Sequence, residues 1–296
     1  TAASADAAVE KVRAMFREDP ATSFVVGWNQ VSGNSPMLCW DTTDHGEDAE
    51  AYTNCQSPDR TVSSFLDMNT AFVRLTGLTP NTNVYFVIKD SEGATDRYYV
   101  LTAPDQPETF TYITGGDTKS SGSALEAGRR SNEMVSRLRP LFVLFNGDFC
   151  SDDGTNPDYW NQWLDDWSNG STTSDGRLIP FLAVHGNHEN GNYETLWKLF
   201  DTPDTNGDPY NYYALDFGGN LLKVISLNSE LQNGEIWAEA FSRQNLWLAD
   251  ELTASVDMQF IIAGYHKPLR PHTSSKAEQP ILQNTWAPLF DSHGVT

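Results

Sequence analysis

A change in sequence pattern at residues 103–107 is the feature that most constrains how this chain can fold. Before it, from Thr22 to Thr102, short runs rich in β-branched and aromatic residues alternate with turn residues, which predicts strands joined by tight turns. After it, apolar runs alternate with stretches of helical periodicity, which predicts an α/β domain whose sheet is largely buried. The Ala-Pro-Asp-Gln-Pro segment between them has the composition of a linker.

The beginning of the chain has its own pattern. Between Ala5 and Arg17, the apolar residues Val9, Val12 and Phe16 share one helical face, which predicts a short leading helix. The expected organisation is therefore a leading helix over residues 1–20, an all-β sandwich over 21–106 and a layered α/β domain over 107–296.

The charge balance limits the classes of partner. The chain has 19 Lys and Arg residues against 40 Asp and Glu residues, which gives a net charge of −21. Such a surface repels phosphate backbones, so a nucleic-acid scaffold is not expected. A small anionic substrate is still compatible with this charge, because bound metal ions can reverse its sign locally. No apolar run is long enough to predict a membrane span.

The three cysteines bear on the compartment. Cys39 and Cys55 lie in one β-rich segment and could pair, which would suit an oxidising compartment and a secreted or periplasmic protein. Cys150 would then be left over. The alternative is three reduced thiols in a cytosolic protein. The first ten residues have no apolar signal-peptide core, so we expect that any secretory signal is already removed or was never present.

Metal-capable side chains recur where apolar strands are predicted to end. In an open α/β sheet, the carboxyl ends of the strands are where binding sites assemble. One Gly-Asp pair after a strand is more often an ordinary turn, but four such strand ends together predict one site. The residues in question are Asp117, Asp148, His185, Asn187, His188, Glu189 and His266.

The chemistry of these side chains indicates a pair of metal ions. Asp117 and Asp148 offer carboxylate oxygens, Asn187 an amide oxygen and His266 an imidazole. This mixture suits iron, manganese and zinc better than calcium or magnesium alone. Two such ions sharing a bridging carboxylate can generate a hydroxide and hold the oxygens of an in-line phosphoryl displacement.

The order Gly-Asp117, Gly-Asp148, Gly-Asn187-His188-Glu189 and His266 resembles the calcineurin-like metallophosphoesterases, and among them the purple acid phosphatases. The segment 75–86 also resembles a strand-turn-strand unit of fibronectin type III domains, which those phosphatases carry in front of the catalytic domain. The resemblance implies that Asp117 binds the first metal, that Asp148 bridges, and that Asn187 and His266 bind the second. His188 would face the substrate, to orient phosphate or to protonate the leaving oxygen.

The implied activity is hydrolysis of phosphomonoesters by a metal-bound hydroxide, with two metal ions drawn from iron, zinc and manganese and a small phosphate ester as substrate. A phosphodiesterase or nucleotidase on the same fold is the enzymatic alternative. The alternative from another class is a catalytically inactive relative that acts as a binding or scaffold protein. The sequence does not indicate an oligomeric state.

Two positions depart from the family pattern. Purple enzymes have a metal-binding Tyr where this chain has Ser151, so their colour is not expected here. Many other relatives have a His where this chain has Lys119, and Lys119 could instead supply positive charge for phosphate. Cys150 or Asp152 could substitute as a ligand of the first metal. His185 and Glu189 are expected to support the site from behind.

A third departure concerns the end of the sequence. Segment 286–296 resembles the part of the family's chain that leads into its next strand. The family places a Gly-His-x-His motif after one further strand, and it supplies a His to each metal. We expect the chain to continue past Thr296 into that motif; the alternative is a protein that ends at Thr296 and cannot complete its site. An apolar strand and paired histidines are predicted within about 15 residues after Thr296, judged from ordinary strand and loop lengths. His293 is expected in the loop before that strand and not at the metals.

Overall fold

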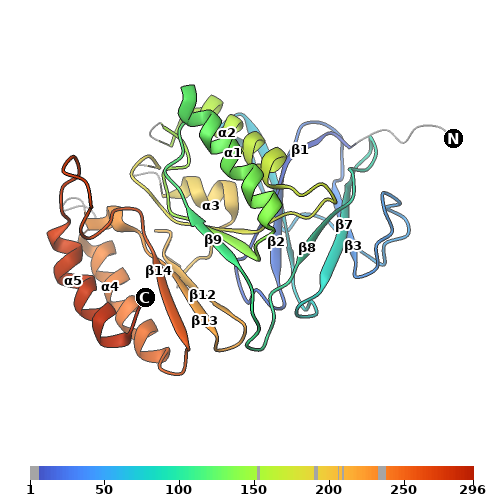
Figure 1. The fold of residues 1–296 in the computed structure, drawn as a ribbon. Helices are drawn as coiled ribbons and strands as arrows, with labels where there is room; N and C mark the ends of the chain where they lie inside the picture. The colour runs from blue at the N-terminus through green and yellow to red at the C-terminus, as the bar shows by residue number, and fades with distance from the viewer. Residues whose placement is uncertain (1–6, 152–153, 190–192, 206, 209, 233–237) are drawn as a thin grey trace.

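The computed structural model describes residues 7–151, 154–189, 193–205, 207–208, 210–232 and 238–296. Figure 1 shows a β-sandwich that contains the N-terminal strands and an α/β part that contains all the labelled helices. This arrangement confirms the predicted fold class. Within the described ranges, no helix is both long enough and apolar enough to cross a lipid bilayer.

The N-terminal sandwich consists of two sheets that pack face to face. One has the strand order β5-β6-β2-β1 and the other β4-β3-β7-β8. Side chains such as Trp28, Leu38, Val73 and Phe86 are fully buried between them. The strands are β1 (Val9–Met15), β2 (Phe24–Gln30), β3 (Met37–Asp41), β4 (Asn54–Gln56), β5 (Arg60–Phe65), β6 (Met68–Leu75), β7 (Asn83–Lys89) and β8 (Tyr98–Leu101).

A disulfide bond joins two strands of the second sheet. Cys39 on β3 lies directly opposite Cys55 on β4, and the two sulfurs are bonded. The predicted pairing is confirmed, and the alternative of three reduced thiols is not what the structure contains. Cys150, the third cysteine, is buried among apolar side chains of the α/β domain.

The predicted leading helix is wrong. Its described part, Val9–Met15, forms strand β1; Ala5 and Asp6 lie outside the described residues. The helical spacing of apolar residues arises because β1 is buried on both faces and contains a bulge between Glu10 and Arg13. With both faces buried, the strict alternation that marks a half-exposed strand disappears.

The α/β domain has four layers. Helices α1 and α2 cover one face of the parallel strands β9, β10 and β11; the other face packs on the β12-β13-β14 sheet, whose outer face is covered by α4 and α5. The elements are β9 (Tyr112–Gly115), α1 (Gly122–Leu138), β10 (Phe142–Phe145), α2 (Pro157–Ser171), β11 (Phe181–Ala183), α3 (Glu194–Phe200), β12 (Tyr213–Phe217), β13 (Leu222–Ser226), η1 (Ser229–Gln232), α4 (Ala238–Ala254), β14 (Phe260–Gly264) and α5 (Pro280–His293).

The aromatic side of α2 forms the core under this sheet. Trp160, Trp163 and Trp167 recur at helical spacing and are buried, and they contact Phe149, Phe181 and Phe200. These three side chains belong to the hydrophobic core of the α/β domain. Because these rings lie directly behind the loop that follows β10, they fix the position of that loop.

The sandwich and the α/β domain share a sheet. Strand β1 pairs in parallel with β11 at Met15 and Phe181, so the order β5-β6-β2-β1-β11-β10-β9 runs through both domains. The two parts are therefore joined by backbone hydrogen bonds as well as by side-chain packing.

A buried carboxylate fastens the two domains at the end of α3. Asp201 is fully buried, and it accepts hydrogen bonds from Arg60 Nη1 at 2.9 Å and from Arg74 Nε at 2.7 Å. Arg17 Nε lies 3.6 Å from the same carboxylate. All three arginines belong to the N-terminal domain, so removing this one charge would leave three partly buried cations without their counter-ion.

We therefore expect Asp201→Asn to lower the free energy of unfolding by about 2–4 kcal/mol, because it leaves this arginine cluster uncompensated. Chemical denaturation followed by circular dichroism measures the change. The matched control is Glu194→Gln, which breaks the exposed pair with Lys198 on the same helix and should cost less than about 0.5 kcal/mol. Equal effects of the two substitutions would show that Asp201 does not anchor the domains.

Candidate metal centre

The strand ends that carry the predicted site residues meet at one edge of the α/β domain. Strands β9, β10 and β11 are parallel neighbours, so their carboxyl ends lie side by side. Strand β14 belongs to the facing sheet, and it reaches the same place through His266. The Nδ1 atom of His266 lies 2.9 Å from the backbone oxygen of Asn146, directly after β10.

Two glycines allow the loops after β10 and β11 to touch. Gly147 has a φ of 79°, and a Cβ atom there would lie 2.7 Å from the Cα of Gly186. A Cβ on Gly186 would lie 2.4 Å from the backbone nitrogen of Asp148. Both distances are too short for any side chain, so this close backbone approach requires glycine at both positions.

Asp148 lies at the centre of the group. The residue is 3% exposed, and its Oδ1 accepts a hydrogen bond from the backbone N–H of His188 at 2.8 Å. Its Oδ2 lies 3.2 Å from Nε2 of His266. Burial alone would raise the pKa of Asp148, but the hydrogen bonds from His266 and from the His188 backbone outweigh burial and lower it. Asp148 is therefore held as a carboxylate, the form that can bind a cation.

His266 is oriented as a ligand would be. With Nδ1 donating to the carbonyl of Asn146, the Nε2 atom faces Asp148 Oδ2 and Asn187 Oδ1, both at 3.2 Å. Burial would lower the pKa of His266, but the hydrogen bond to Asp148 overrides this effect and raises it. A carboxylate oxygen and an amide oxygen thus converge on the proton of Nε2, which a metal ion would displace.

His188 lies at the open side of the group. Its Nε2 atom is 3.8 Å from Asp148 Oδ2, and its side chain is 34% exposed. The backbone of His188 is fixed by the hydrogen bond to Asp148, while the ring reaches toward solvent. A group placed in this way can approach a molecule bound from outside.

Glu189 supports the centre from behind. It is fully buried, and its carboxylate accepts hydrogen bonds from the backbone N–H groups of Asp148 at 2.9 Å, Phe149 at 2.9 Å and Gly186 at 2.7 Å. Burial raises the pKa of Glu189 to about 7, although the backbone donors act in the opposite direction. Glu189 therefore positions the loops after β10 and β11, and it is too deeply buried to contact a substrate.

Asp117 lies beside the group, but its carboxylate is engaged with another partner. Its backbone N–H donates to the oxygen of Gly147 at 2.9 Å, so its loop adjoins the loop of Asp148. Its side chain is exposed, and its Oδ1 contacts the ammonium of Lys119. Ser151, at the position of the Tyr in purple enzymes, exchanges backbone-to-hydroxyl hydrogen bonds with Ser120, both at 2.9 Å.

His185 lies next to the centre, where it interacts with the charges of Asp148 and His266, whereas Cys150 and His293 face other parts of the structure. His185 is fully buried against the ring of Tyr193, and burial lowers its pKa to about 3. Cys150 is 1% exposed within the apolar cluster around Phe149 and Trp160. Asp152 lies outside the described residues. His293 ends helix α5, instead of lying in a loop as predicted, and its ring nitrogen Nδ1 is 2.9 Å from the carbonyl of Leu289.

The donor set fits a metal ion on one side of the centre. Asp148, Asn187 and His266 bring a carboxylate, an amide oxygen and an imidazole to one point. Among the described residues, no group of three or more His, Cys, Asp or Glu side chains is arranged to hold a metal; the third donor here is the amide of Asn187. On the other side, Asp117 faces an ammonium and does not form a comparable set.

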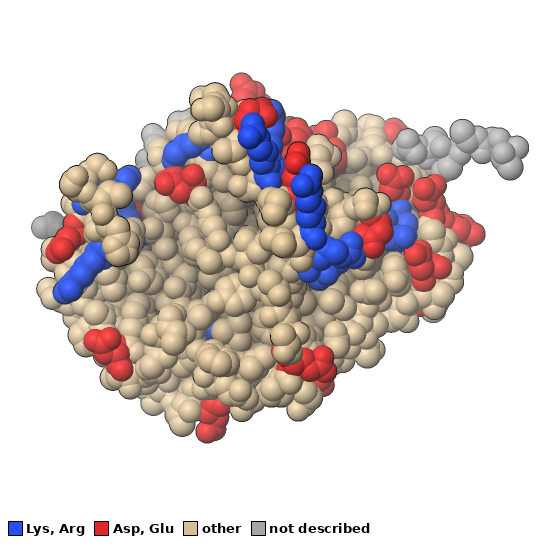
Figure 2. All heavy atoms as spheres, in the orientation of Figure 1, with Lys and Arg blue, Asp and Glu red and all other residues tan. Residues whose placement is uncertain are grey.

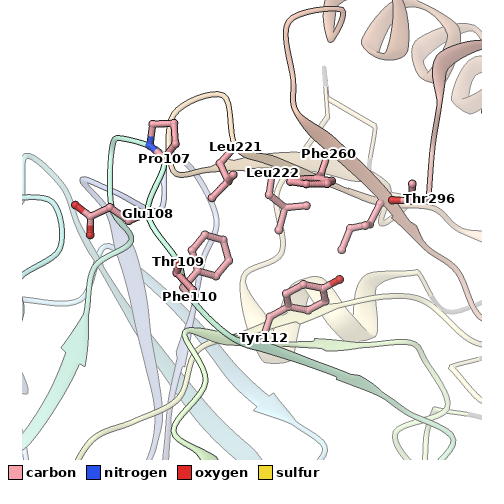
Figure 3. A pocket seen from close by; sticks show the side chains of 10 residues that line it. Pro107, Glu108, Thr109, Phe110, Tyr112, Leu221, Leu222, Phe260 and Thr296 are labelled. Carbon is pink, nitrogen blue, oxygen red and sulfur yellow. The ribbon is translucent and has the colours of Figure 1, made fainter.

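An apolar groove lies between the edge strands of the two sheets, beside the beginnings of β9 and β14. It has a volume of about 420 Å³. Figure 3 shows Phe110 and Tyr112 on one side and Leu221, Leu222 and Phe260 on the other, with Thr296 at one end. In Figure 2, the surface over β9 and β14 has few charged side chains, although the chain is strongly acidic. A smaller hollow continues from this groove past Thr114 to Asn146.

Two supporting residues were not foreseen from the sequence. Asn146 orients His266 through its backbone carbonyl, and Ser120 fastens the loop after β9 to the loop after β10. Asn146 stands directly before Gly147 and Asp148, so the sequence predicts its place at the strand end. The sequence does not predict the contact of its carbonyl with His266, because that contact joins the two sheets across 120 residues of chain.

Comparison with known proteins agrees with this arrangement. Residues 9–102 match the family model described as "Purple acid Phosphatase, N-terminal domain", and residues 118–296 match "Calcineurin-like phosphoesterase". Two uncharacterized proteins from two strains of Mycobacterium tuberculosis are 26% identical over 321 residues. These matches cover 95% of this chain and 58% of the relatives, so the chain spans a little over half the length of those proteins.

Solved structures share the fold at low identity. The purple acid phosphatase PPD1 from yellow lupin (Lupinus luteus) seeds is similar with a TM-score of 0.73 at 13% identity, over 97% of this chain and 57% of that chain. The structure of PhoD is similar with a TM-score of 0.63 at 13% identity, over 90% of this chain and 64% of that chain. A dimetal phosphatase from Danio rerio is similar with a TM-score of 0.50 at 15% identity, over 63% of this chain and 79% of that chain.

We expect Glu189→Gln to weaken metal binding at the site, although Glu189 is not itself one of the candidate metal ligands. The amide nitrogen of Gln would face a backbone N–H, so one of the three hydrogen bonds is replaced by a donor–donor contact. The expected loss is about 1–3 kcal/mol in the free energy of unfolding and roughly 10- to 100-fold in affinity for Mn²⁺. Denaturation and calorimetric titration measure the two effects.

The control for this variant is Glu133→Gln on the exposed side of α1, whose carboxylate is 3.8 Å from Arg137. It should leave both quantities unchanged. If Glu189→Gln binds Mn²⁺ as tightly as the unmodified protein, Glu189 does not position the centre.

Proposed function

Since the chain belongs to the calcineurin-like phosphoesterase family, we propose that it is a metal-dependent enzyme that hydrolyses phosphate monoesters. The observation that carries the proposal is the meeting of Asp148, Asn187 and His266 at one point, with the ring of His188 beside them on the open side. These side chains come from the ends of β10, β11 and β14, and they provide metal-binding and proton-transferring groups within a few ångströms.

The proposed roles follow from the contacts of each residue. Asp148, Asn187 and His266 would hold the metal, which when bound acts as a Lewis acid on a phosphoryl oxygen and lowers the pKa of a water molecule. Asn146 keeps Nε2 of His266 directed at the centre. Glu189 holds the backbone of Asp148, so that its carboxylate does not have to reorganise when the cation binds.

His188 is proposed to act on the substrate. Its backbone is fixed to Asp148 and its ring is partly exposed, so Nε2 can reach an ester oxygen while the metal-binding side chains stay in place. As a protonated imidazole it would donate a proton to the leaving alkoxide, and as a hydrogen-bond donor it would orient the phosphate.

The family's paired-histidine motif remains a prediction for residues beyond Thr296. The backbone N–H of Thr296 donates to the oxygen of Ile261 at 2.9 Å, on the edge of β14 that no described strand covers. A further strand parallel to β14 would lie in the groove of Figure 3 and would direct its carboxyl end toward Asn146 and His266. The reading frame after Thr296 tests this point.

The Cys39–Cys55 disulfide supports an oxidising compartment. We accordingly propose that the protein acts outside the cytosol, as a secreted or periplasmic enzyme. Its isolation from cell fractions, with the disulfide intact in the extracytoplasmic fraction, tests this proposal.

Removal of metal should abolish hydrolysis. With the protein expressed from its complete reading frame, we expect p-nitrophenyl phosphate to be cleaved, chelation to stop the reaction, and Mn²⁺, Zn²⁺ or Fe²⁺ to restore it. His266→Ala should bind metal at least roughly 10-fold more weakly, because it removes one donor. Cleavage of bis(p-nitrophenyl) phosphate in preference to the monoester would point to a phosphodiesterase, and no cleavage of either to a binding protein.

His188→Ala should lower kcat by roughly 10²–10⁴-fold for esters with poor leaving groups, because such esters need a proton on the leaving oxygen. For p-nitrophenyl phosphate, whose leaving group is already stable as an anion, the loss should be much smaller. Steady-state rates on glycerol phosphate and p-nitrophenyl phosphate measure the difference. Equal losses on both substrates would assign His188 to phosphate orientation instead of proton transfer.

A further inference from the structure

We propose that the ammonium of Lys119 supplies the positive charge on the Asp117 side of the centre. The protein would then hold a single metal ion, on Asp148, Asn187 and His266, with the lysine in place of a second one. The inference rests on the proposed function, because it concerns how that same site would bind a phosphate group.

The first argument is the difference between the two sides of Asp148. On one side, an amide oxygen and an imidazole nitrogen converge with its carboxylate. On the other side, the carboxylate of Asp117 contacts Nζ of Lys119. A protonated amine has three hydrogens to donate and no lone pair for a metal. It also repels a cation brought to the same carboxylate, so Lys119 excludes a second ion instead of binding it.

The second argument is that the neighbouring donor atoms are engaged elsewhere. The hydroxyl of Ser151 accepts from the backbone of Ser120, and that of Thr118 donates to the backbone oxygen of Phe149 at 2.6 Å. Cys150 is buried in the apolar cluster behind the loop. In the described part of the two loops, Asp117 therefore has no additional side-chain donor turned toward it with which to share a metal.

The third argument is the fixed position of the lysine at the open side. The loop after β9 is fastened to the loop after β10 by the N–H of Thr118, which donates to the backbone oxygen of Asp148 at 3.0 Å, and by the reciprocal bonds of Ser120 and Ser151. Lys119 lies between these attachments and Asp117 directly before them, and their side chains are 41% and 59% exposed. The ammonium therefore faces the side from which a substrate would arrive.

This placement favours a particular class of ligand. A phosphate monoester presents several anionic oxygens, of which one could meet the metal and another the ammonium. Exposed ion pairs contribute little to stability, so the contact between Lys119 and Asp117 can open when a phosphate oxygen takes its place. Lys119 would thus be a substrate-binding residue, and Asp117 would hold it in position while the site is empty.

The decisive measurement is the number of metal ions per chain. The protein from the complete reading frame is stripped with a chelator, reconstituted with Mn²⁺ and freed of excess ion; the bound manganese is then counted by elemental analysis. We expect one ion per chain and the six-line electron paramagnetic resonance spectrum of an isolated Mn²⁺. Two ions with an exchange-coupled spectrum would overturn the inference and leave the proposed function intact, whereas no bound ion would overturn both.

Two variants test the lysine itself. Lys119→His places an imidazole two residues after Asp117, and it should admit a second Mn²⁺ and produce the exchange-coupled spectrum; if the folded variant still binds one ion, the inference is wrong. Lys119→Gln removes the charge without adding an imidazole. It should keep one ion and weaken inhibition by inorganic phosphate roughly tenfold. Unchanged inhibition would also contradict the inference.

The control is Lys198→Gln, which removes a lysine from an exposed pair with Glu194 on α3. It should change neither the metal count nor phosphate inhibition. Thermal melts followed by circular dichroism establish that each variant is folded before the metal is counted.

Discussion

The candidate site depends on one buried carboxylate that is not part of the metal-binding set. Glu189 binds the backbone N–H groups of Asp148, Phe149 and Gly186, which belong to the loops after two neighbouring strands. These loops approach each other so closely that glycine is required at positions 147 and 186, and Glu189 accepts the backbone N–H groups that this approach brings together. The position of Asp148, and through it the positions of His188 and His266, follows from this set of hydrogen bonds.

Much of this could be predicted from the sequence, because the relevant signals are local. Apolar strands followed by Gly-Asp or by Gly-Asn-His-Glu mark the carboxyl ends of a buried sheet, and the neighbouring ends of parallel strands must lie close together. The prediction failed at β1 for a reason of context. This strand joins the two domains' sheets, is buried on both faces and contains a bulge, so its apolar residues imitate helical spacing.

The rest of the site could not be predicted because it consists of contacts between distant segments. The carbonyl of Asn146 meets His266 only after the two sheets have packed, and nothing near either residue indicates the other. The pairing of Ser120 with Ser151 likewise joins loops that are 31 residues apart. For Lys119, the sequence shows an unusual residue two positions after Asp117, and the structure adds the contact between them on which its proposed role rests.

The electrostatics of the site also bear on how it could attract an anion. Asp148 and Glu189 are buried carboxylates, Asp117 is a third beside them, and the whole chain carries a net charge of −21. Against these charges, the described side chains at the centre offer the ammonium of Lys119 and the ring of His266, whose pKa the hydrogen bond to Asp148 raises. A phosphate dianion would be repelled from such a group, since its charge would add to theirs. In the proposed enzyme, a cation held by Asp148, Asn187 and His266 would offset these charges, so that the site could attract the anion.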